Sequence, residues 1–398
     1  MTGVVDEAAV GRIFREESGR SVAAVIGFCG DIDLAEDAVQ EAFALALRKW
    51  PQDGLPPNPG GWITTTARNR ALDRLRRDAR GRELLGEMAV LATEDDLGEV
   101  DVVPDERLRL IFTCCHPALS PEARVALTLR LLGGLSTTDV ARAFLVTEDA
   151  MAQRVVRAKR KIKAARIPYR VPAAEELPSR LRSVLAVIYL VYTTGLTRPG
   201  LCAEAIRLAR ILVGLMPDEP EVAGLLALVL LVESRRATRI RPDGSLVLLG
   251  EQDRRCWDRA LIEEGQAIVR RCLLRNHPGP YQIQAAINAV HADAATAAQT
   301  DWRQILALYD QLFAIAPTSV VALNRAIAVA EVHGSAAALA LVDELDLDHY
   351  YAFHATRADL LRRLGRDDDA HAAYQRAATL APADAERDFL GRGGRGAR

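Results

Sequence analysis

The sequence of 398 residues predicts an all-α protein. Three short segments with helix start signals lie between Leu119 and Lys163, and two amphipathic helical patterns precede them. After Pro172 the chain is rich in Ala and Leu at helical spacing. We therefore expect helical domains at residues 8–82 and 108–168, an acidic linker at 83–107 between them, and a helical extension at 172–390.

Local start and stop signals divide residues 119–163 into three short helices. Ser120 followed by Pro121 is an N-cap with proline at the first helical position, and Gly133–Gly134 ends that helix. Ser136 can cap a second helix, and Thr147 can cap a third. Short helices joined in this way predict a helix-turn-helix.

The third of these helices has one apolar side and one basic side. The apolar stripe comprises Met151, Val155, Ala158 and Ile162. The opposite side carries Gln153, Arg154, Arg157, Arg160 and Lys161. From residue 147 to 170 there are eight Lys or Arg against two acids, whereas the whole chain has a net charge of −2. A solvated basic face is the simpler interpretation, but the two capped helices before it and a second arginine-rich helix upstream favour contact with DNA.

Residues 58–77 form this second arginine-rich helix. Its apolar side comprises Ile63, Ala67, Ala71, Leu72 and Leu75. Its polar side comprises Asn69, Arg70, Asp73, Arg76 and Arg77. Arg68 falls on the apolar side, so we expect a buried carboxylate to pair with it.

Residues 31–50 form an amphipathic helix whose outer face is acidic. The buried stripe comprises Val39, Phe43, Ala46 and Trp50, and the outer face begins with Asp33, Glu36, Asp37 and Glu41. Because phosphate repels carboxylates, this helix is expected to face a basic protein surface instead of DNA.

These three motifs, in this order, resemble the two conserved domains of an extracytoplasmic-function sigma factor of the sigma-70 family, over residues 10–167. The resemblance assigns residues 8–82 to sigma region 2 and residues 108–168 to sigma region 4. It implies promoter DNA and core RNA polymerase, through its β′ clamp helices and β flap, as partners. It also implies promoter recognition and transcription initiation as the function.

The same resemblance implies roles for individual residues. In that family the acidic helix binds the β′ clamp helices, at positions matched here by Asp37, Gln40 and Glu41. The arginine-rich helix binds the single-stranded minus-ten element, at positions matched by Asn69, Arg70, Asp73 and Arg77, with the loop at residues 51–61 as a base pocket. The recognition helix reads the minus-thirty-five element, which indicates Gln153, Arg154, Arg157 and Arg160.

The extension after residue 172 is expected to be an irregular stack of helix pairs. Its end resembles a tetratricopeptide repeat at the small, aromatic and terminating positions Ala358, Gly365, Ala370, Tyr374, Ala377 and Pro382. An arm near residues 241–258, opened by an Arg-Pro-Asp-Gly turn, is followed by the cluster Asp253, Arg254, Arg255, Trp257 and Asp258. The cluster is either a connecting loop with a core tryptophan or a regulatory contact that docks on the sigma half. An extension of this kind resembles a sigma subgroup with a large C-terminal domain, which implies that it modulates activity and binds a protein or small molecule.

Composition excludes several classes of protein. No apolar run approaches the roughly 20 residues needed to span a bilayer, and no secretory leader pattern begins the chain, so we expect a cytoplasmic protein. Six cysteines show no CxxC spacing, and packing is favoured over metal binding for Cys114, Cys115 and His116, so no metal or cofactor is expected. No nucleophile elbow, phosphate loop or HExxH is present, so an enzyme is not expected. The alternative is a stand-alone DNA-binding regulator with a helical sensor or scaffold domain, which would not need the acidic helix.

Overall fold

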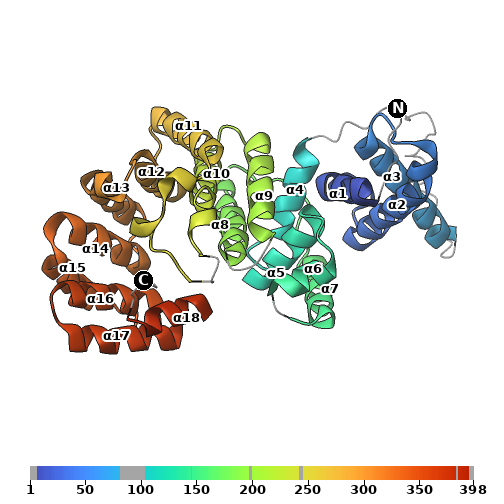
Figure 1. Ribbon diagram of the computed structural model, residues 1–398. Coiled ribbons are helices and arrows are strands. Elements are labelled where there is room, and N and C mark those ends of the chain that lie inside the picture. The colour runs from blue at the N-terminus through green and yellow to red at the C-terminus, as the bar shows by residue number, and fades with distance from the viewer. Residues whose placement is uncertain are drawn as a thin grey trace. The chain divides into compact units, whose positions relative to one another are not determined.

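The computed structural model describes residues 7–80, 104–144, 146–196, 200–241, 245–381 and 384–393. These residues form helices, and their one β-bridge is an isolated antiparallel pair between Ile240 and Leu246. The predicted all-α class is therefore confirmed (Figure 1). In the described ranges, no helix combines the length and apolar character needed to cross a membrane. The chain divides into two compact units, Met1–Ile211 and Leu212–Arg398.

The first unit is built of helices. In order they are α1 (Glu7–Cys29), α2 (Ile32–Asp53), α3 (Pro59–Arg80), α4 (Pro104–Cys114), α5 (Pro121–Leu127), the π-helix η2 (Thr128–Leu132), α6 (Thr137–Phe144), α7 (Glu148–Ala164), α8 (Leu177–Gly195) and α9 (Leu201–Leu215), the last of which crosses into the second unit. Residues 83–103 of the expected acidic linker lie outside the described residues, and its last four residues belong to α4.

Helices α1, α2 and α3 pack together around the apolar stripe that the sequence predicts for α2. Asp31 caps α2, because its carboxylate accepts hydrogen bonds from the backbone N–H groups of Asp33 and Leu34. The stripe of Val39, Phe43, Ala46 and Trp50 is buried. These aromatic side chains make edge contacts, Phe43 with Phe14 and Trp50 with Trp62, at centroid distances of 4.6 and 5.4 Å.

The predicted helix-turn-helix is confirmed by its caps. The Ser120 hydroxyl accepts from the Ala123 N–H, the Ser136 hydroxyl from Asp139, and the Thr147 hydroxyl from Ala150, at 3.0–3.3 Å. The first helix passes through η2 before Gly133, and Gly134 takes the left-handed φ of 67° that glycine accommodates without strain. The whole apolar stripe predicted for α7 is buried. The capping residues in the local sequence therefore predict correctly where α7 begins.

Helices α8 and α9 extend the first unit beyond the predicted domain end at residue 168. The guanidinium of Arg180 on α8 donates to the Phe112 carbonyl at 2.9 Å, and that of Arg207 on α9 donates to the Leu132 carbonyl at 3.0 Å. The first compact unit therefore includes α8 and most of α9, although the sequence places the start of the extension at residue 172.

The second unit is a succession of helices with short 3₁₀ turns in its arm. In order its elements are α10 (Pro220–Glu233), η3 (Arg236–Thr238), η4 (Leu249–Glu251), η5 (Arg254–Cys256), α11 (Arg259–Arg275), α12 (Pro280–Asp293), η6 (Ala297–Gln299), α13 (Trp302–Ile315), α14 (Ser319–His333), α15 (Ser335–Asp343), α16 (Tyr351–Arg363), α17 (Asp367–Leu380) and α18 (Asp384–Gly391). The turn residues 242–244 of the arm lie outside the described residues.

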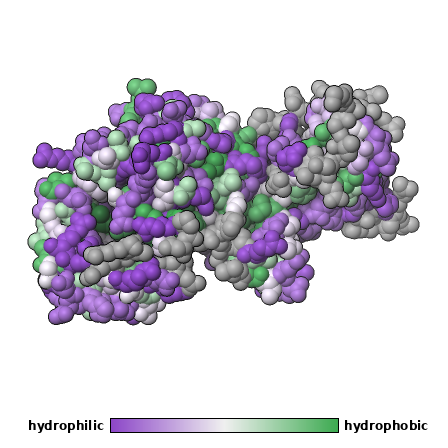
Figure 2. Space-filling view, viewed as in Figure 1, coloured by the Kyte–Doolittle hydropathy of each residue, from purple (hydrophilic) through white to green (hydrophobic). Residues whose placement is uncertain are grey.

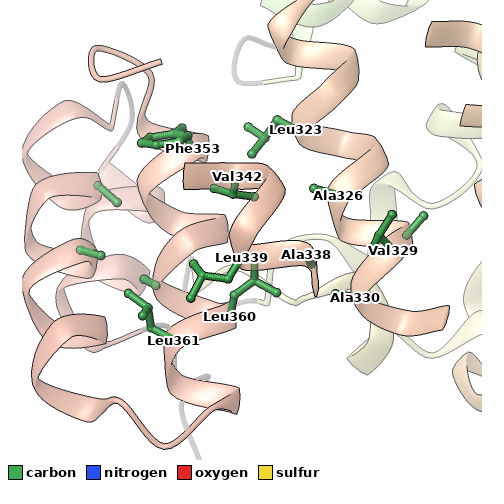
Figure 3. Close-up of a cluster of buried hydrophobic side chains, with 14 of the residues drawn as sticks. Leu323, Ala326, Val329, Ala330, Ala338, Leu339, Val342, Phe353, Leu360 and Leu361 are labelled. Atoms are coloured by element: carbon green, nitrogen blue, oxygen red, sulfur yellow. The ribbon is translucent and has the colours of Figure 1, made fainter. Parts of the chain in front are cut away.

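A continuous apolar core joins the helices from α12 to α18. In Figure 3, Val329 of α14, Leu339 of α15 and Leu361 of α16 belong to this core. Helices α16 and α17 form a hairpin whose turn contains Gly365 at a φ of 72°. The small and aromatic positions Ala358, Ala370, Tyr374 and Ala377 are all buried, whereas Pro382 lies outside the described residues. Small side chains thus let these two helices approach closely.

Candidate nucleic-acid interface

The outward face of α7 carries the predicted DNA-reading residues. Gln153, Arg157 and Arg160 are exposed, and Arg154 is half-buried. A hollow of about 470 Å³ lies between the start of α5 and α7, and its lining includes Arg154, Arg157 and Lys161. In Figure 2 the surface over α7 is mostly hydrophilic. The arrangement presents guanidinium groups that can bind guanine edges or phosphate.

A second exposed polar face lies on α3. Its predicted residues Asn69, Arg70, Asp73 and Arg77 are all exposed. The Asn58 side chain accepts from the Gly61 N–H at 2.9 Å and so caps this helix. Because α2 continues to Asp53 and α3 begins at Pro59, the connecting loop is shorter than the expected segment 51–61. The two surfaces predicted to contact DNA are therefore on separate helices, α3 and α7.

The expectation for Arg68 is wrong. Its guanidinium lies over the Phe28 ring, 4.8 Å from the centroid, and no carboxylate pairs with it among the residues that the structure describes. Arg68 is only half-buried, so its charged end keeps contact with water while its stem packs on apolar surface. An aromatic partner replaces the expected carboxylate.

The acidic face of α2 is paired with arginines of α3. A nitrogen of Arg74 lies 3.0 Å from the Asp37 carboxylate, and Arg74 also bonds Glu41. Arg70 lies 3.9 Å from Glu41, and Gln40 donates to Glu36 at 3.3 Å. The hydrogen bond that Arg74 donates to the Asp37 carboxylate is the main reason that the pKa of Arg74 is raised. These side chains are largely accessible to water, so each pair contributes only about 0–1 kcal/mol and can exchange for another partner.

Glu36 is different from the other acids of α2 because it is buried. Its two oxygens lie 2.6 Å from the Lys159 ammonium of α7 and 2.5 Å from the Arg130 guanidinium of η2. Lys159 also lies 2.7 Å from Asp33. The side chains of Glu36, Lys159 and Arg130 are 10%, 12% and 14% exposed. Burial disfavours the charged form of Lys159, but Glu36 and Asp33 outweigh it and raise its pKa.

The buried cluster joins helices from both predicted sigma domains. The sequence predicts Glu36 on the outer face of α2, and the structure corrects this. The sequence also did not indicate which bases pair with these acids, namely Arg74, Arg130 and Lys159. Charge sign was the only signal available, because Lys159 and Glu36 are 123 residues apart. Which basic residue meets which acid depends on how the helices pack.

The five residues of the arm cluster are divided between the core and the surface. Arg254 and Trp257 are buried, at 6% and 4% exposure, and the Arg254 guanidinium lies 5.1 Å from the Trp257 ring centroid. Asp253 and Arg255 are exposed and bind each other at 2.8 Å, a contact that lowers the pKa of Asp253 to about 2. Asp258 caps α11. Asp253, Arg255 and Asp258 are therefore exposed, and of these Asp258 is already used as a helix cap.

The cysteine pair beside His116 is packed in the first unit. Cys114 and Cys115 are buried, and burial raises the pKa of Cys115 to about 11, which keeps its thiol protonated at neutral pH. His116 accepts a hydrogen bond from the Ala118 N–H through Nδ1. In the described part of the chain, no group of three or more His, Cys, Asp or Glu residues could hold a metal ion.

Comparisons with known proteins agree with these two helical domains. Residues 13–81 match Sigma-70 region 2, residues 109–162 match Sigma-70, region 4, and residues 180–273 match a family of unknown function (DUF6596). An uncharacterized protein of Rhizobium meliloti is 41% identical over 98% of this chain and 95% of its own length. No solved structure matches the chain.

Two further relatives have names that describe a sigma factor. The probable ECF RNA polymerase sigma factor SigI of Mycobacterium tuberculosis is 30% identical over 37% of this chain and 51% of its own length. The ECF RNA polymerase sigma factor SigK of Mycobacterium bovis is 26% identical over 40% of this chain and 86% of its own length. The chain thus spans about half the length of SigI and most of SigK.

The two sigma regions, in order and on the helices described above, define the class. The chain belongs to the extracytoplasmic-function sigma factors of the sigma-70 family. A sigma factor is the promoter-recognition subunit of RNA polymerase and is not an enzyme. Its partners are core RNA polymerase and promoter DNA. In this chain, a helical C-terminal part follows the two sigma regions.

Proposed function

We propose that this sigma factor binds promoters at two elements, the minus-ten element through α3 and the minus-thirty-five element through α7. The observation that carries the proposal is one exposed, arginine-bearing helix face in each matched sigma region. On α3 the contacts come from Asn69, Arg70, Asp73 and Arg77. On α7 they come from Gln153, Arg154, Arg157 and Arg160. Arginine suits both phosphates and the O6 and N7 atoms of guanine.

Helix α2 is the proposed polymerase contact. Asp37, Gln40 and Glu41 bind the β′ clamp helices, and region 4 binds the β flap. The support is that, within the described ranges, Asp37 and Glu41 are held by the water-accessible pairs with Arg74 and Arg70. A basic partner can replace such pairs at little cost.

The helical extension is proposed to modulate transcription by binding a protein or small molecule. Its accessible arm residues Asp253 and Arg255 support a contact surface, whereas Arg254 and Trp257 build the core beneath them. Reversing both exposed charges, Asp253→Arg with Arg255→Asp, is expected to change the amount of transcript. It should leave the preferred promoter sequence unchanged, because the residues proposed to contact DNA lie on α3 and α7.

The cytoplasm, where the chromosome and RNA polymerase meet, is the proposed location.

Run-off transcription with core RNA polymerase tests the proposal. Promoters are selected from a genomic library, and transcripts are measured with and without the full chain. We expect promoter-dependent transcripts only with the protein. Arg157→Ala should reduce them at least tenfold, and the matched control Lys163→Ala, an exposed base in the last turn of α7, should reduce them much less.

Two outcomes would contradict the proposal. One is the absence of any promoter-dependent transcript with the full chain. The other is sequence-specific DNA binding by the protein alone, with no effect of core polymerase on affinity or transcription. The second result would support a stand-alone regulator instead.

A further inference from the structure

The outward face of α7 contains one large apolar side chain. Val156 is 44% exposed, whereas Met151, Val155 and Ile162 of the same helix are buried. All residues of α7 belong to the described part of the chain. Val156 is thus the one exposed large hydrophobic residue on the recognition helix.

Helix geometry places Val156 among the DNA-reading residues. It is three residues after Gln153 and four before Arg160, and side chains at these spacings are neighbours on a helix surface. The buried stripe lies on the opposite side of α7. Val156 therefore reaches whatever surface Gln153 and Arg160 reach.

One group in the major groove matches an apolar side chain of this size. Among the four bases, thymine alone presents a methyl group there, and small apolar side chains contact it. Valine is stiff at χ1, so its methyl groups are held in one position relative to the neighbouring polar side chains. This rigidity suits recognition of a single base.

We propose that Val156 contacts the C5 methyl group of a thymine in the minus-thirty-five element, beside the bases bound by Gln153, Arg157 and Arg160. The inference rests on the proposed function, because it requires α7 to lie in the major groove. It adds recognition of the thymine methyl group, with which a carboxamide or guanidinium makes no hydrogen bond. Val156 is then a specificity-determining residue.

Single-atom changes in the DNA test this contact. Deoxyuridine lacks only the C5 methyl group of thymine, so each thymine of the element is replaced by deoxyuridine in turn. Binding of the full chain with core RNA polymerase is measured on each promoter. We expect one substitution to weaken binding about fourfold, the factor that burial of one methyl group contributes.

Variants of the protein, measured on the thymine and deoxyuridine promoters, test whether Val156 makes this contact. Val156→Ala should weaken binding to the thymine promoter and remove the difference between thymine and deoxyuridine. Val156→Thr keeps one methyl group in nearly the same shape, so it should retain part of the difference. Leu274→Ala is the control, because Leu274 is 86% exposed but lies on α11 in the second unit.

Different experimental results would overturn this inference and the proposed function. If the holoenzyme shows no promoter preference, the proposed function is overturned, and the inference is overturned with it. If it prefers a promoter but tolerates deoxyuridine at every position, or if the element contains no thymine, the inference alone is overturned. Equal weakening by Val156→Ala on both DNAs would also overturn it, because Val156 would then act on the protein and not on the methyl group.

Discussion

The carboxylate of Glu36 lies 2.6 Å from the ammonium of Lys159, across 123 residues of sequence. Glu36 belongs to the acidic helix α2, and Lys159 belongs to the recognition helix α7. Arg130 completes the pairing from η2 at 2.5 Å. One buried carboxylate thus pairs with two cations and links α2, the proposed polymerase contact, to α7, the proposed DNA-reading helix.

Glu36→Gln is expected to destabilise the protein by about 3 kcal/mol, because it leaves the buried Arg130 without its carboxylate partner and Lys159 with only the exposed Asp33. Urea denaturation, followed by circular dichroism, measures the change. Asp33→Asn is the matched control: its side chain is 73% exposed, so loss of its contact with Lys159 should cost under about 1 kcal/mol. Equal effects of the two substitutions would show that burial of Glu36 contributes nothing.

Arg74→Ala is expected to strengthen binding to core RNA polymerase by up to about fivefold. Arg74 pairs with both Asp37 and Glu41, so its removal frees these carboxylates for a basic partner. Titration of labelled protein with core polymerase measures the affinity. Arg76→Ala is the control on the same helix, because Arg76 is exposed and has no carboxylate partner in the described residues. Weaker binding by Arg74→Ala would mean that Arg74 itself contacts the polymerase.

Arg254→Met is expected to destabilise the protein by about 3 kcal/mol. The Arg254 guanidinium donates to the carbonyls of His291 and Ala294 at 2.6 and 2.8 Å and to the Thr300 hydroxyl at 3.0 Å. Methionine would leave these buried acceptors unsatisfied. Thermal or urea denaturation measures the loss. Arg255→Met is the neighbouring control, since its side chain is exposed, and a comparable loss there would refute the structural role of Arg254.

Stability is expected to fall on acidification because of His291. Burial, with smaller contributions from Arg235 and Arg254, lowers the pKa of His291 to about 4. The imidazole is therefore neutral in the fold but titrates near pH 6.5 when unfolded. Its stabilising contribution is fully present above pH 6.5 and is lost as the pH falls toward 4. The loss should be about 2 kcal/mol at pH 5.

Urea denaturation of the protein and of His291→Phe, at pH 7.5 and pH 5, checks this expectation. Phenylalanine keeps a ring against Trp302, whose centroid lies 5.3 Å from that of His291, but it cannot bind a proton. The variant should lose less stability than the parent between the two pH values. His371→Phe, at an exposed site, should behave as the parent does. An identical pH dependence in all three proteins would contradict the expectation.

Local features of the fold were predictable from local sequence. The caps at Ser120, Ser136 and Thr147 and the buried stripe of α7 all depend on residues within about one helical turn of one another. The same holds for the apolar stripe of α2. Side-chain capping and 3.6-residue periodicity are short-range effects, so a single sequence carries them.

Partners of charged side chains were not predictable in this way. Arg68 lies over Phe28 instead of a carboxylate, and Glu36 is buried although it falls on the polar side of α2. Arg254 is also buried, although the charged residues beside it in the sequence suggested a cluster at the surface. In each case the deciding neighbour is on another helix, which periodicity within one helix cannot reveal.

The sequence by itself determined the all-α class, the order of the sigma regions and the exposed basic faces of α3 and α7. Only the tertiary structure decided that Glu36 is shared by Lys159 and Arg130, and that Arg74 covers Asp37 and Glu41. The physical reason is how far apart along the chain the interacting residues can be. Helix formation depends on residues a few positions apart, whereas an ion pair forms wherever packing brings two charges within about 4 Å, whatever their separation along the chain.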